Sequence, residues 1–67
     1  MMHFAAKRKA ARHKAGLTQK QAAERLGFSQ SAIRQYEQGQ SRPSYERLID
    51  MCRLYGVSPD TLLGLDP

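Results

Sequence analysis

The chain has 67 residues and a formal net charge of +5, with 40% hydrophobic and 25% charged residues. This length suits one small domain, and the composition excludes both a disordered chain and a membrane span. A single cysteine, Cys52, excludes an internal disulfide. No His/Cys cluster has metal-ligand spacing, so we expect no metal, cofactor or small-molecule ligand.

The basic residues gather in the N-terminal part of the chain. Residues 1–25 hold seven basic side chains and one acidic side chain, whereas residues 43–67 hold two basic and four acidic ones. A one-sided basic surface attracts nucleic acid, although such charge also serves solubility alone. The N-terminus lacks the apolar run of a secretion signal, so we expect a cytoplasmic protein without a membrane partner. An amphipathic organelle-targeting peptide is the weaker alternative.

Small polar residues and glycines divide the chain into helices. Thr18, Ser29, Ser44 and Ser58 each precede a helix-forming run, and Gly16, Gly27, Gly39 and Gly56 each follow one. Strand-like alternation is missing, and β-branched residues are few. The sequence therefore predicts an all-α fold with five helices. Their expected ranges are 4–15, 19–26, 30–38, 45–55 and 59–64.

The second and third predicted helices form a pair joined by a tight turn. Ala22, Ala23 and Leu26 form one narrow apolar stripe, and the small Ala23 lets the next helix cross closely. Gly27 permits the sharp turn. Ile33 and Tyr36 are expected to anchor the underside of the helix over residues 30–38.

The fourth predicted helix has the best-defined apolar face. That face is expected to contain Tyr45, Leu48, Ile49, Cys52 and Tyr55, with Met51 beside it. Cys52 is interpreted as a small core residue. Leu62, Leu63 and Leu65 are the last apolar residues of the sequence. As apolar residues at an exposed chain end, Leu62 and Leu65 are predicted to contribute to dimerisation.

The upper face of the helix over residues 30–38 is polar. It presents Gln30, Ser31, Arg34, Gln35 and Gln38. Gln can form paired hydrogen bonds with adenine, Arg can do so with guanine, and Ser can bond either base. In helix-turn-helix proteins the N-terminal part of the second helix faces base edges in the major groove. The pattern predicts binding of double-stranded DNA, and an ordinary solvated helix face is the alternative.

Residues 17–39, LTQKQAAERLGFSQSAIRQYEQG, resemble the helix-turn-helix of the lambda-repressor-like family, the phage repressor/Cro or xenobiotic-response-element type. The resemblance continues through Arg42-Pro43-Ser44 to residues 56–63 and covers roughly residues 4–63. It implies a compact five-helix DNA-binding domain over residues 1–67. Family members usually bind operator DNA as symmetric dimers.

The resemblance also implies roles for individual residues. Gln30, Ser31 and Gln35 match base-contacting positions, and Arg34 is expected to join them. The positions expected to contact backbone phosphates are Gln19, Gln38, Gly39, Gln40, Ser41 and Arg42. Arg12 and Glu37 match an ion pair that joins the first helix to the end of the third.

Three positions depart from the family pattern. Large aliphatic residues are usual where Arg8 and Ala11 stand, and leucine is usual where Ala22 stands. These changes predict a thin core beside the first helix and modest stability. We expect Arg8 to lay its methylene stem across the gap and to send its charged head to solvent.

The function predicted from these features is transcription regulation, with a repressor reading a pseudo-palindromic operator as a homodimer. The alternative is an antitoxin or co-regulator that uses the same scaffold to hold a partner protein. Such antitoxins usually need an additional binding segment, and only four residues follow Leu63. An enzyme is disfavoured because no nucleophile–base pair, carboxylate pair or glycine-rich phosphate loop stands out.

Overall fold

The computed structural model describes the backbone of residues 3–62 and the side chains of residues 5–62. Within this range the chain forms five helices and no strand, which confirms the predicted all-α class. The helices are α1 (His3–Lys14), α2 (Gln19–Leu26), α3 (Gln30–Gln38), α4 (Tyr45–Tyr55) and α5 (Pro59–Leu62). The predicted end of the last helix, at residues 63 and 64, lies outside the described residues. No described helix is long and apolar enough to cross a membrane.

The predicted capping residues determine where the helices begin and end. Thr18 forms a capping box, in which its hydroxyl accepts from the backbone N–H of Gln21 and its own N–H donates to the Gln21 side chain. Ser29 and Ser44 cap α3 and α4 in a simpler way, each accepting one backbone N–H. Gly27 has φ +74°, the left-handed conformation that lets the chain turn sharply from α2 into α3.

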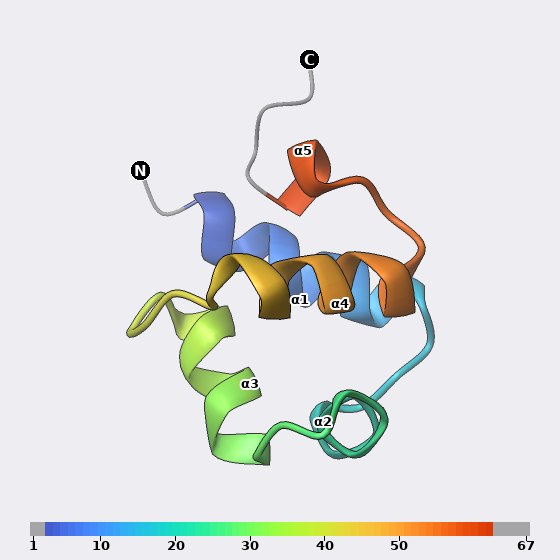
Figure 1. Cartoon of the computed structure of the whole chain (residues 1–67), viewed down its shortest axis with the longest axis vertical. Coiled ribbons are helices and arrows are strands. Elements are labelled where there is room, and N and C mark those ends of the chain that lie inside the picture. The colour runs from blue at the N-terminus through green and yellow to red at the C-terminus, as the bar shows by residue number, and fades with distance from the viewer. Residues whose placement is uncertain (1–2, 63–67) are drawn as a thin grey trace.

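The helices form a small bundle around one core. α1 packs against α3, α4 and α5, while α2 packs against α3 and α4. Figure 1 shows α1 and α4 lying across the middle of the molecule, with α2 and α3 on one side of them and α5 on the other. This arrangement supports α3 from within and leaves its outer side uncovered.

The core contains few large side chains. Ile33, Met51 and Leu62 are fully buried, and many other buried positions hold alanine, including Ala11 and Ala22. The predicted loss of apolar volume beside α1 is therefore present in the structure. Cys52 is buried within this cluster, as expected for a small core residue.

Two predictions about apolar residues are wrong. Tyr45 is 76% exposed, so the buried face of α4 begins at Leu48 and runs through Met51, Cys52 and Tyr55. The predicted stripe began one turn too early, in the first turn of the helix. Leu62 is 0% exposed because α5 folds against α1 and α4, so its side chain completes the core of its own chain and does not lie at the exposed surface that the dimerisation prediction assumed. Leu65 lies outside the described residues.

Candidate nucleic-acid interface

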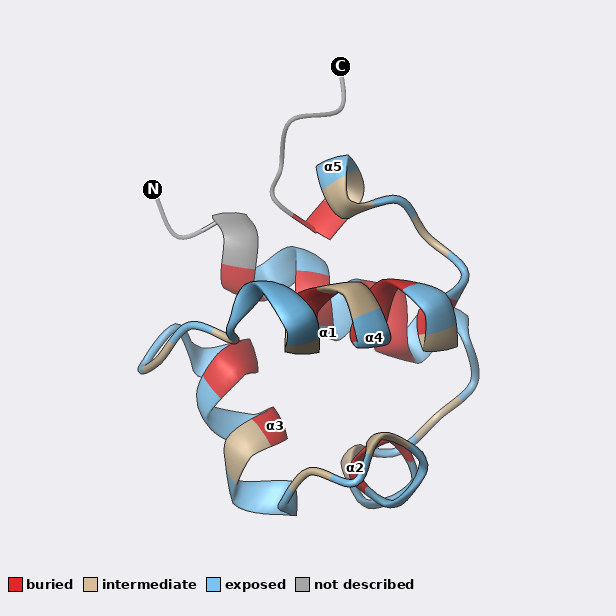
Figure 2. Cartoon of the chain, in the orientation of Figure 1, coloured by how far each residue is buried: buried red, intermediate tan, exposed pale blue. Residues whose placement is uncertain are grey.

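The two sides of α3 differ sharply in exposure. Ile33 is fully buried and Tyr36 is buried, as predicted, so they hold the helix from below. The polar residues of the predicted DNA-reading face are all exposed; they are Gln30, Ser31, Arg34, Gln35 and Gln38. Figure 2 shows exposed positions along the outer side of this helix. The turn from α2 thus presents a helix whose free face is rich in hydrogen-bonding groups.

The loop after α3 is tied to the end of that helix. Gly39, with φ +77°, and Gln40 both donate their backbone N–H to the carbonyl of Gln35. The Ser41 hydroxyl donates to Oε1 of Gln35 at 3.5 Å. Gln40 and Arg42 are exposed, whereas Ser41 is half-buried. The residues expected to contact phosphates therefore adjoin the polar face of α3.

A buried ion pair joins α1 to α3. Nε of Arg12 donates to Oε2 of Glu37 at 2.6 Å, and Nη2 donates to Oε1 at 3.0 Å. The two side chains are 5% and 2% exposed. The hydrogen bond to Glu37 raises the pKa of the Arg12 guanidinium. This two-pronged geometry is the strongest form of an Arg–carboxylate contact.

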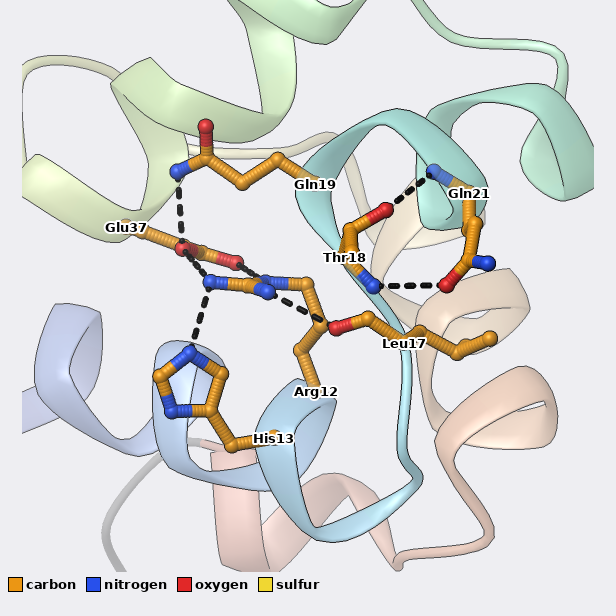
Figure 3. Close-up of polar contacts among 7 residues, drawn as sticks. All are labelled: Arg12, His13, Leu17, Thr18, Gln19, Gln21 and Glu37. Carbon is orange, nitrogen blue, oxygen red and sulfur yellow. Dashed lines mark hydrogen bonds and ion pairs between the residues drawn. The ribbon is translucent and has the colours of Figure 1, made fainter.

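Other polar groups complete the surroundings of this pair, as Figure 3 shows. Nη1 of Arg12 donates to the carbonyl of Leu17 at 2.8 Å, and Nη2 lies 3.2 Å from Nε2 of His13. Gln19, in the first turn of α2, donates its side-chain N–H to Oε1 of Glu37 at 3.2 Å. The Gln19 amide thus contacts the ion pair inside the protein, and its contact with a DNA phosphate stays a prediction.

The ion pair also determines the charge of α3. Glu37 is the only acidic residue of that helix, and its carboxylate is buried against a guanidinium. The exposed face consequently carries one positive charge, Arg34, and no negative charge. A carboxylate on that face would repel the phosphates of a nucleic acid, so its burial keeps the face compatible with a polyanion.

The prediction for Arg8 is wrong. Its head does not reach solvent, since the whole residue is only 5% exposed. Nη1 donates to the backbone carbonyl of Tyr36 at 2.9 Å, in the last turn of α3. Burial lowers the pKa of this guanidinium, and the positive charge of Arg42 lowers it further. The carbonyls at the end of a helix lack partners within the helix and attract a cation, which explains why the side chain turns inward.

A cluster that the sequence interpretation missed holds α3 from the side of α4. The guanidinium of Arg47 lies 4.2 Å from the ring centre of Phe28, and Nη1 donates to the Tyr36 hydroxyl at 2.8 Å. The Phe28 and Tyr36 rings meet edge to face at 6.4 Å. Phe28 belongs to the turn between α2 and α3, so the cluster links that turn, α3 and α4.

The sequence contained one usable signal for these positioning residues. Arg8 and Arg12 stand four residues apart and share one face of α1, so a buried partner for Arg12 implies burial of Arg8. Arg47 carried no such signal, because its contacts depend on where α4 lies relative to Phe28 and Tyr36. Among the described residues no group of His, Cys, Asp or Glu side chains could hold a metal ion.

Comparison with known proteins identifies the class to which this fold and surface belong. A family model described as a helix-turn-helix domain matches residues 3–64. The chain therefore belongs to the helix-turn-helix family, and the predicted resemblance is confirmed.

Two proteins of Bacillus subtilis (strain 168) are among its relatives. The chain is 45% identical over 58 residues to the HTH-type transcriptional regulator ImmR, covering 87% of this chain and 46% of ImmR. It is 43% identical over 49 residues to YobD, an uncharacterized HTH-type transcriptional regulator, covering 73% of this chain and 44% of YobD. The chain spans less than half the length of these relatives.

Proposed function

We propose that this chain binds double-stranded DNA in a sequence-specific manner and regulates transcription, with α3 in the major groove. The observation that carries the proposal is the structure of α3 itself. Ile33 and Tyr36 are buried, while Gln30, Ser31 and Gln35 are exposed on a face without acidic residues. The similarity to proteins named as transcriptional regulators supports the same function.

The proposed contacts fall into two groups. Gln30, Ser31, Arg34 and Gln35 read base edges, because their side chains offer the donors and acceptors that match adenine and guanine. The phosphate contacts come from Gln19, Gln38, Gln40, Ser41 and Arg42. These contacts set the position of the domain on the duplex without carrying sequence information.

We further propose that the chain acts as a repressor and binds a pseudo-palindromic operator as a homodimer. The resemblance to phage repressors supports this assignment. In such a dimer the two α3 helices lie about 34 Å apart, one turn of DNA. The interface lies elsewhere than at Leu62, since that side chain is fully buried in its own chain.

Selection of bound sites from a random DNA pool tests the proposed function. We expect one enriched motif, with two-fold symmetry if the chain binds as a dimer. Failure to enrich any motif at moderate salt would contradict sequence-specific binding. An enriched motif without symmetry would contradict the dimer alone.

Single variants then separate the two groups of contacts. We expect Gln30→Ala and Gln35→Ala each to relax the preference at one base position, at a cost of about 1–3 kcal/mol on the preferred site. Arg42→Ala serves as the matched control. It should weaken all sequences alike and reduce the salt dependence of binding. An equal loss on every sequence for the two glutamine variants would refute their assignment as base readers.

A further inference from the structure

Two buried arginines of α1 reach the same end of α3 but differ in their partners. Arg12 pairs with the Glu37 carboxylate at 2.6 Å. Arg8, one helical turn away and equally buried, donates to a neutral backbone carbonyl at Tyr36. Among the described residues, no carboxylate forms an ion pair with Arg8, and its Nε has no hydrogen-bond partner. Within residues 5–62, Arg8 is therefore a buried positive charge without a matching negative one.

Arg8 lies beside the loop of residues 39–42. Its bond to the Tyr36 carbonyl places the guanidinium against the last turn of α3, where that loop begins. One turn earlier in α1, the Cβ of Ala5 lies 3.6 Å from the place that a Cβ on Gly39 would occupy. Arg42, at the end of the loop, is close enough for its charge to act on Arg8. Two cations thus flank the same short loop.

An unpaired buried cation is costly to keep, and the repulsion from Arg42 adds to the cost. Leucine-like side chains would fill the same space without that cost. A buried charge is also weakly screened by salt, so it acts strongly on an anion at the nearby surface. A charge in this position becomes favourable once an anion binds at the loop.

Resting on the proposed DNA binding, we propose that Arg8 is the buried cation of a phosphate site at residues 39–42. A backbone phosphate of DNA supplies the negative charge that Arg8 lacks inside the protein. Arg42 forms the exposed half of this site and Arg8 the buried half. The hydrogen bond from Arg8 to Tyr36 holds the end of α3 in register with that phosphate.

The test compares three variants with the natural chain. Arg8→Gln removes the charge but keeps a donor for the Tyr36 carbonyl, and Arg8→Lys keeps the charge. Arg53→Gln is the matched control, since Arg53 is exposed and lies about 12 Å along α4 from the end that adjoins the loop. Circular dichroism verifies that each variant is folded. If Arg8→Gln does not fold, Arg8→Met takes its place.

The first measurement is the affinity for a mixed-sequence duplex as a function of salt concentration. We expect Arg8→Gln to reduce the slope of log K against log salt by about 0.9, which corresponds to about eight-fold weaker binding at 0.1 M salt. Arg8→Lys and Arg53→Gln should retain the natural slope. An unchanged slope in a folded Arg8→Gln chain would overturn the proposal and leave Arg8 as a helix cap only.

The second measurement uses inorganic phosphate and the free protein. At equal ionic strength, phosphate should raise the thermal midpoint of the natural chain above its value in chloride, and raise that of Arg8→Gln less. If the natural chain binds no duplex but shows this difference, the DNA-binding function fails and the anion site stands. If it binds no duplex and both chains respond equally, the anion site fails as well.

Discussion

Replacing Arg12 by methionine tests the buried ion pair that joins α1 to α3. The substitution leaves the Glu37 carboxylate, whose side chain is 2% exposed, without its cation. Stranding a buried charge in this way costs about 3–5 kcal/mol. The Leu17 carbonyl also loses its donor, which adds about 1 kcal/mol. At about 0.05–0.15 kcal/mol per residue, a domain of this size has only about 3–10 kcal/mol of stability, so the variant should be partly or fully unfolded.

The assay is urea unfolding at neutral pH, followed by circular dichroism, for a double-mutant cycle. Its members are the natural chain, Arg12→Met, Glu37→Leu and the double variant. Removing both charges exchanges a buried ion pair for apolar packing, which is often nearly neutral. We therefore expect the double variant to be more stable than Arg12→Met by about 2 kcal/mol or more.

Arg53→Met is the control, because it removes an exposed cation and should change the free energy of unfolding by no more than about 0.5 kcal/mol. The loss in Arg12→Met should persist at ~0.5 M salt, since a buried pair is weakly screened. Additive losses in the double variant would refute the reasoning. They would mean that each side chain stabilises the fold through separate contacts and not through the pair.

Three further predictions concern stability measured by the same assay. Burial raises the pKa of Tyr55 from its ordinary 10.0 to about 12, so its stabilising contribution is complete below pH 10 and is lost as the pH rises towards 12. In Tyr55→Phe, the free energy of unfolding should fall between pH 10 and pH 12 by about 2–3 kcal/mol less than in the natural chain. Equal pH profiles for the two chains would contradict this prediction. Arg47→Met should cost about 1–2 kcal/mol by removing both the stacking on Phe28 and the bond to the Tyr36 hydroxyl, and no loss would show that the cluster is incidental. Gly39→Ala should cost about 1–2 kcal/mol from backbone strain at φ +77° alone, because its Cβ would meet Ala5 at an ordinary 3.6 Å; a much larger loss would indicate a clash.

The helix boundaries could be predicted because their signals are local. Thr18, Ser29 and Ser44 accept backbone N–H groups within three residues, and Gly27 and Gly39 adopt the left-handed conformation at the helix ends. None of these interactions depends on how the helices pack. The buried side of α3 followed equally from the spacing of its apolar residues.

The wrong predictions concern residues whose exposure depends on how the helices pack. Tyr45 continues the apolar stripe of α4 in sequence, yet no other described element covers this residue, which is 76% exposed. Leu62 was expected at the surface because it lies near the end of the chain. The periodicity of apolar residues does not show whether such a short helix packs back onto the core. Arg8 was expected to reach water, but the unsatisfied carbonyls at the end of α3 offered its guanidinium an internal partner.

The polar contacts that hold α3 are concentrated at one end. Guanidinium groups from α1 and α4 converge on two adjacent residues: Arg8 on the Tyr36 carbonyl, Arg47 on the Tyr36 hydroxyl and Arg12 on Glu37. Directional networks of this kind fix a position more narrowly than packing of small side chains does. The N-terminal half of α3 is held chiefly by the burial of Ile33 and by the Ser29 cap.

This asymmetry matters for recognition. The fixed end adjoins the loop of residues 39–42, so the phosphate contacts proposed for that loop would define where the helix lies on a duplex. The less constrained end carries the exposed Gln30 and Ser31, whose proposed contacts with bases would need small adjustments of side chain and backbone. If the proposed contacts are right, α3 is anchored at its phosphate-binding end and less constrained at its base-reading end, and two buried arginines, Arg8 and Arg12, together with the half-buried Arg47 produce that difference.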